Sequence, residues 1–146
     1  MTIHKIEERT NTEQNAKLTK AYHKLQVLID ELNKREIPEN IQNTINTDIA
    51  RINSFLETDK KLVRILRKVY YKTLRLIEKE LNLVTKNHYK NLYMAIGVAL
   101  GVAFSASFDN NGMGLILGLA IGISVGIHFD KRAEQNGNQL NLESNC

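Results

Sequence analysis

The sequence has few of the residues that most often carry chemistry. It contains one cysteine, one proline and no tryptophan. Because Cys146 has no second cysteine to pair with, it cannot form a disulfide within the chain. It is the last residue and does not stand four from the end as a prenylation site would. The four histidines are widely separated and lack the spacing of a metal site. Because no P-loop or nucleophile elbow is present either, we expect no enzymatic activity, no cofactor and no metal.

Charge is missing from one long region of the chain. Residues 91–129 contain a single charged residue, Asp109, although the chain as a whole is 25% charged and carries a net charge of +4. As helices, the uncharged runs 91–108 and 110–129 would extend about 27 and about 30 Å, close to the thickness of a bilayer's hydrocarbon core. The residues between them, Asp-Asn-Asn-Gly, favour a turn. The pattern predicts a transmembrane hairpin over 91–129. Residues 1–15 contain no apolar run, so no signal peptide is expected.

Small residues recur every four positions in both runs. In a water-exposed helix a glycine costs about 1 kcal/mol relative to alanine, whereas in lipid it lets another helix approach closely. The stripes fit two arrangements: self-association of several chains, including one around a pore, or the two helices of one chain packed together. The predicted packing residues are Gly97, Gly101 and Ser105 in the first run and Gly114, Gly118, Gly122 and Gly126 in the second, and a further small stripe comprises Ala95, Ala99, Ala103 and Ser107.

The block from Ala95 to Ile127 resembles the glycine-zipper hairpins of small bacterial membrane proteins. The resemblance implies membrane insertion. The ATP-synthase proteolipid is also a glycine-rich hairpin, but it has glycines at period two and a carboxylate within the membrane. Here His128, near the end, is the one ionisable residue in the two runs, so we do not expect ion translocation of that kind.

The residues before the hairpin predict a helical cytoplasmic domain over 10–90. A heptad stripe indicates a first helix over about 11–35, beginning at a capping box formed by Thr10 and Glu13. Pro38 ends it and opens a second helix over about 38–56. A third helix is expected to run from 59 through Lys90 into the bilayer without a break. The stripe residues are Leu18, Tyr22, Leu25, Ile29 and Leu32 in the first helix and Ile41, Ile45, Ile49, Ile52 and Phe55/Leu56 in the second.

The resulting fold class is all-α, with a three-helix coiled-coil-like cytoplasmic domain followed by a two-helix transmembrane hairpin. No strand is expected. Residues 1–9 are predicted to form a flexible lead, and residues 130–146 a disordered polar tail.

A basic stripe follows one face of the predicted third helix. Its residues favour contact with anionic lipid headgroups, a phosphate-rich partner or an acidic protein face. The alternative is a solvated surface, partly neutralised by acids of the first two helices such as Glu31 and Asp48. Base stacking is not indicated, so a nucleic acid partner is not expected. The stripe comprises Lys61, Arg64, Lys68, Lys72, Arg75 and Lys79.

Basic residues flank both ends of the hairpin. Lys86 and Lys90 precede it, Lys131 and Arg132 follow it, and the turn carries only Asp109. By the positive-inside rule, both termini are expected in the cytoplasm and the protein in the inner (cytoplasmic) membrane. A re-entrant hairpin would place the termini on the same side.

These features predict a non-enzymatic small integral membrane protein. The first hypothesis is a homo-oligomer joined through the glycine-zipper helices, with a pore or membrane-permeabilising assembly as its extreme form. The alternative is a membrane-tethered helical adaptor that binds a cytoplasmic partner and forms no pore.

Overall fold

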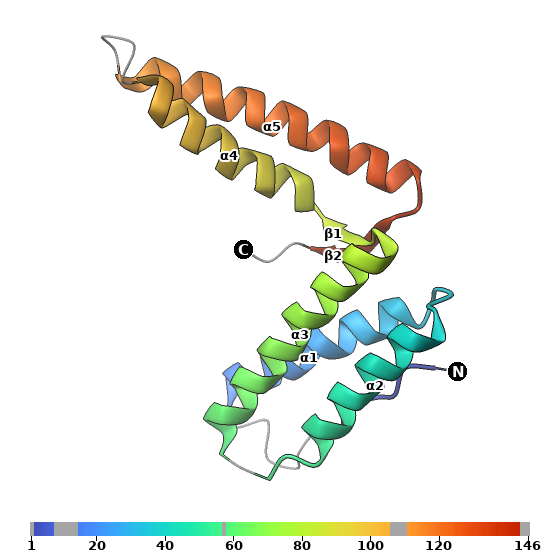
Figure 1. The fold of residues 1–146 in the computed structure, drawn as a ribbon. Helices are drawn as coiled ribbons and strands as arrows, with labels where there is room; N and C mark the ends of the chain where they lie inside the picture. The colour runs from blue at the N-terminus through green and yellow to red at the C-terminus, as the bar shows by residue number, and fades with distance from the viewer. Residues whose placement is uncertain (1, 8–14, 57, 106–110, 144–146) are drawn as a thin grey trace. The chain divides into compact units, whose positions relative to one another are not determined.

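The structure is a computed structural model that describes residues 2–7, 15–56, 58–105 and 111–143 (Figure 1). It is mostly helical, as predicted, with five helices and two short strands within these ranges. The chain divides into two compact units, unit 1 over Met1–Asn82 and unit 2 over Leu83–Cys146.

Three helices form unit 1: α1 (Ala16–Leu32), α2 (Glu39–Asn53) and α3 (Asp59–Leu81). The predicted capping box at Thr10 and Glu13 lies outside the described residues, and the cap of α1 is Asn15, whose side chain accepts a hydrogen bond from the Leu18 amide at 3.3 Å. Pro38 stands directly before α2, at its N-cap. α3 packs against both α1 and α2 (Figure 1).

The predicted apolar faces form the core of unit 1. All five stripe residues of α1 are buried, and so are the four isoleucines predicted for α2. The expectation that Phe55/Leu56 would extend the α2 face is wrong for Leu56, because α2 ends at Asn53 and Leu56 is 94% exposed. The core residues of α3 are Leu62, Leu66, Val69, Tyr70, Thr73 and Ile77.

The described part of the lead is not a free segment, contrary to the expectation for residues 1–9. Ile3 and Ile6 are buried. The Asn33 side chain accepts a hydrogen bond from the Ile3 amide at 2.9 Å and donates one to the Ile3 carbonyl at 3.1 Å. Asn46 bonds the residues on either side of Ile3, accepting from the His4 amide and donating to the Thr2 carbonyl. Side-chain amides of the α1 C-cap, Asn33, and of α2 thus pair with the backbone of this segment as a neighbouring strand would.

α3 ends at Leu81 and does not run on to Lys90. Asn82 adopts a left-handed conformation with φ 54°, and its amide donates to the Glu78 carbonyl at 3.0 Å. Asparagine tolerates this conformation better than most residues, so it can close a helix where glycine is absent. Val84 and Thr85, both β-branched, then begin a strand instead of a further helical turn.

Unit 2 contains β1 (Val84–Lys86), α4 (His88–Ser105), α5 (Asn111–Gln135) and β2 (Gln139–Glu143). α4 and α5 run side by side as a hairpin, and the two strands pair at its base (Figure 1). The pairing is parallel, with Val84 opposite Gln139 and Thr85 opposite Leu140. Because α4 and α5 run in opposite directions, the chain must reverse once more after α5 to make this pairing.

Gly137 makes that reversal, and the prediction of a disordered tail over 130–146 is wrong for its described part. Gly137 has φ +72°, its amide donates to the Glu134 carbonyl, and the Asn138 amide donates to the Ala133 carbonyl at 2.8 Å. These two bonds are the Schellman pattern that closes a helix. After the turn, Leu140 is fully buried in β2, so its apolar side chain holds the strand in place.

Candidate functional site

Six of the seven glycines of α4 and α5, all except Gly112, lie in one seam between the two helices. A Cβ added at Gly101 would stand 2.7 Å from the Gly114 carbonyl oxygen and 2.9 Å from the Leu115 Cα. At Gly126 it would stand 2.5 Å from the Lys90 Cα. Such distances are shorter than a real Cβ tolerates, and the obstacle is backbone that cannot rotate away. The seam therefore has no room for a side chain at these positions.

The contacts along the seam run in antiparallel order. Gly97 faces Gly118 and Gly122, whereas Gly101 faces Gly114 and Gly118. Ser105 continues the α4 side, where its hydroxyl donates to the Gly101 carbonyl at 2.8 Å. All seven predicted packing residues are therefore brought together within one chain. This is the second of the two arrangements that the sequence left open.

The outer surface of the hairpin carries the large side chains. Val102 is 60% exposed, Ile116 69% and Ile121 64%. In the further small stripe, Ala95, Ala99 and Ala103 are also exposed, and Ser107 lies outside the described residues. A continuous apolar exterior of this kind marks contact with a membrane or with another protein.

Length and composition distinguish the two helices. Among the described residues, α5 over Gly112–Gln135 is the one helix long and apolar enough to cross a membrane. α4 begins with the polar sequence His-Tyr-Lys-Asn and ends at Ser105. The expected span over 91–108 therefore includes residues beyond the described part of α4.

A polar and aromatic clamp closes the base of the hairpin. The two carboxylate oxygens of Asp130 accept hydrogen bonds from the Tyr89 and Lys90 amides at 3.0 and 2.9 Å. These amides belong to the first turn of α4, where helical partners are missing. Next to it, the rings of Tyr93 and Phe129 stack with centroids 5.3 Å apart. Sequence reasoning missed this clamp, since Asp130 lies forty residues after Lys90, whose amide it caps.

The predicted basic stripe lies on the exposed face of α3. All six residues are exposed, but they are not equivalent. Lys72 forms an ion pair with Asp48 at 2.7 Å, as the solvated-surface alternative expected, and Lys79 lies 3.7 Å from Glu80. Glu31, the other acid considered, pairs with Lys34 and Arg35.

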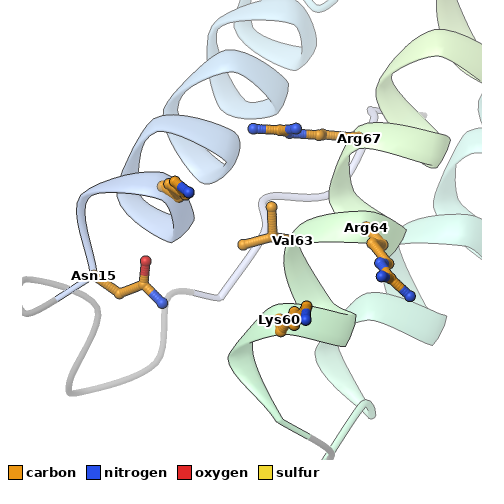
Figure 2. Close-up of a pocket in the computed structure, with 6 residues that line it drawn as sticks. Asn15, Lys60, Val63, Arg64 and Arg67 are labelled. Carbon is orange, nitrogen blue, oxygen red and sulfur yellow. The ribbon is translucent and has the colours of Figure 1, made fainter.

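A second basic feature, which sequence reasoning missed, lies between α1 and α3. We call it the basic groove. One hollow of about 300 Å³ is lined by Lys17, Lys60 and Arg67 among others, and Figure 2 shows Arg67 extending from α3 toward α1 above Val63. A second hollow of about 240 Å³ shares Lys17 and Arg67 with the first and adds Lys20 and Lys24. The spacing of Lys17, Lys20 and Lys24 on one helix face was the available signal.

Among the described residues, no group of three histidine, cysteine, aspartate or glutamate side chains could hold a metal ion.

Comparison with known proteins agrees with the close packing of α4 and α5 through glycines. No curated protein and no solved structure matches the chain. Residues 85–132 match the family model described as glycine zipper membrane protein. That range contains β1 from its second residue, the whole seam and the Asp130 clamp. The resemblance to glycine-zipper membrane proteins is confirmed for this segment, and it supports a membrane location and close helix packing.

Proposed function

We propose that this protein is a non-enzymatic membrane-tethered adaptor. In this proposal the hairpin of α4 and α5 anchors the chain in the inner membrane, and unit 1 binds a partner in the cytoplasm. The observation that carries the proposal is the seam, because both glycine stripes are used within one chain. The other helix of the same hairpin occupies the space where side chains of the stripe would lie. The stripe therefore has no surface left for a second chain.

The outer surface supports the anchoring role. Large apolar side chains cover it and glycines occupy the interior, which is the distribution expected where lipid surrounds the helices. The basic flanks at Lys86, Lys90, Lys131 and Arg132 favour cytoplasmic termini.

A water-filled pore has less support. Such a pore needs polar side chains along one face. Ser105 is buried and bonded to Gly101, and Ser124 donates to the Ala120 carbonyl at 2.8 Å. Each hydroxyl donates its hydrogen bond to a backbone carbonyl of its own helix. Neither therefore has a donor left for water in a pore.

Homo-oligomerisation is the second candidate, through a different face. Ala95, Ala99 and Ala103 leave a small stripe exposed on α4. Small residues at this spacing would let a second hairpin approach. In this form of the hypothesis the glycines close the hairpin and the alanines join the copies.

Two measurements test these proposals. Alkaline carbonate extraction should leave the full chain in the membrane pellet, and release into the supernatant would contradict the anchor. The mass of the complex in a mild detergent should then correspond to one chain. If an oligomer is found, Ala99→Leu with Ala103→Leu should dissolve one built on the alanine stripe. Gly118→Leu with Gly122→Leu should dissolve one built on the glycines.

A further inference from the structure

The basic groove brings together cations that are distant in sequence. Lys17 and Arg67 line both hollows, while Lys20 and Lys24 line one and Lys60 and Arg64 the other. Because residue numbers rise in the same direction on both sides, α1 and α3 run parallel along the groove. From Lys17 to Lys24 the helix rises about 10 Å, so the cations form two facing rows of that length.

These cations are not neutralised within the described part of the chain. Among the described residues, no ion pair involves any of the six, although acids elsewhere in unit 1 pair with Lys34, Arg35 and Lys72. No acidic side chain among the described residues lines either hollow. The Asp59 carboxylate, which is not among the lining groups, accepts a hydrogen bond from the Asn15 side chain at 3.4 Å. Six cations that gather with no acidic side chain among the described lining residues repel one another and leave the groove attractive to an anion.

The backbone adds to this positive potential. Asn15 is the N-cap of α1, and Lys60 is the second residue of α3, so both helices begin beside the first hollow. Helix N-termini carry partial positive charge. Arg67 extends across the hollow and offers a planar donor group that suits phosphate oxygens (Figure 2).

We propose that the basic groove binds phosphate groups, with Lys17 and Arg67 as the central contacts. Each hollow has room for a phosphate with part of the group that carries it. A ligand with two phosphates, or two neighbouring headgroups, would match the length of the groove. The source is either the headgroup of an anionic phospholipid or a soluble polyphosphate, and the lipid source rests on the proposed membrane anchor.

The test compares two double variants that remove equal charge. Lys17→Gln with Arg67→Gln empties the centre of the groove. Lys68→Gln with Arg75→Gln removes two exposed cations of the α3 stripe that line neither hollow. All four side chains are exposed, so both proteins should fold, which circular dichroism and thermal unfolding would verify.

Binding is measured with the full chain in two settings. In a neutral detergent, inorganic tripolyphosphate is titrated into the protein. In phosphatidylcholine nanodiscs, the protein is co-sedimented with vesicles containing about one quarter phosphatidylglycerol, since anionic lipid attracts basic surfaces. The groove variant should weaken binding at least about tenfold in one setting, and the stripe variant less than about twofold. The setting in which binding occurs identifies the source.

Equal loss in both variants would overturn the proposal in favour of diffuse charge attraction. Absence of binding in both settings would overturn it as well. Because the tripolyphosphate titration needs no membrane, failure of the anchor in carbonate extraction would be seen separately from failure of the groove.

Discussion

Unit 1 and the hairpin of unit 2 are built from helices with opposite distributions of side-chain size. In unit 1 large apolar residues such as Leu25 and Leu66 are fully buried, and most charges lie outside, with Glu31 as an exception. In the hairpin the interior is glycine, and large residues such as Ile116 are exposed. Burying a leucine from water stabilises a fold by about 1.5–3 kcal/mol. Lipid is as apolar as the leucine, so in a membrane only close packing and hydrogen bonds remain to join helices.

The comparison also separates two kinds of sequence information. Both regions repeat their interior residues every three or four positions, and this spacing alone predicts helices. The size of the repeated residue distinguishes the two surroundings. Leucine and isoleucine predict an interior shielded from water, and glycine predicts one in which backbones touch.

The largest effect is expected from a variant that fills the glycine seam with side chains. Gly118→Leu with Gly122→Leu places two large side chains where the α4 backbone lies, so α4 and α5 should separate by several ångströms, about half of an ordinary 8–10 Å interaxial distance. Spin labels on cysteines at Ala99 and Ile121, with Cys146 replaced by serine, would report this by electron–electron distance measurement. Both labelled side chains are exposed.

The matched control is Leu115→Ala with Leu119→Ala, which removes side-chain volume from the same helix outside the glycine stripe. It should leave the distance distribution unchanged. An unchanged distribution in the glycine variant would mean that the seam is not the contact between α4 and α5.

The next test makes the same type of substitution, leucine to alanine, once in each region. Leu25→Ala in the core of unit 1 should lower the free energy of unfolding by about 2–5 kcal/mol, because it leaves a cavity. Leu100→Ala, at a side chain that is 52% exposed on the hairpin, should change stability by less than about 0.5 kcal/mol. Hydrogen exchange read by mass spectrometry on the full chain in nanodiscs would follow both helices. Similar losses at the two sites would contradict the proposed difference in surroundings.

A smaller effect is expected at the base of the hairpin. Asp130→Ala leaves the Tyr89 and Lys90 amides without their acceptor and should destabilise the first turn of α4 by about 1–3 kcal/mol. Faster hydrogen exchange at these two amides is the measurement. Glu134→Ala, also on α5 and exposed, should leave them protected. Equal exchange rates in the two variants would mean that α4 itself, and not Asp130, protects the Tyr89 and Lys90 amides.

The smallest effect concerns the N-terminal segment of unit 1. Asn33→Ala removes both hydrogen bonds to Ile3 and should lower stability by about 1 kcal/mol, while Ile3 and Ile6 keep part of the segment in place. Chemical denaturation followed by circular dichroism would measure it. Asn43→Ala on exposed α2 surface is the control. If hydrogen exchange showed that the Asn33→Ala variant loses all amide protection at residues 2–7, Asn33 alone would hold this segment.

The sequence by itself determined the helical class, the α1 and α2 faces, and the glycine seam positions. These are local properties, because helical spacing places residues on one face whatever that face contacts. Only the tertiary structure decided that the glycine stripes meet within one chain, that Asp130 caps α4, and that Lys17 and Arg67 share a groove. Each of these joins segments far apart in the chain, and periodicity holds no information about which faces meet. The strands were missed for the same reason: β1 and β2 are short, and each is stabilised by pairing with a segment more than fifty residues away.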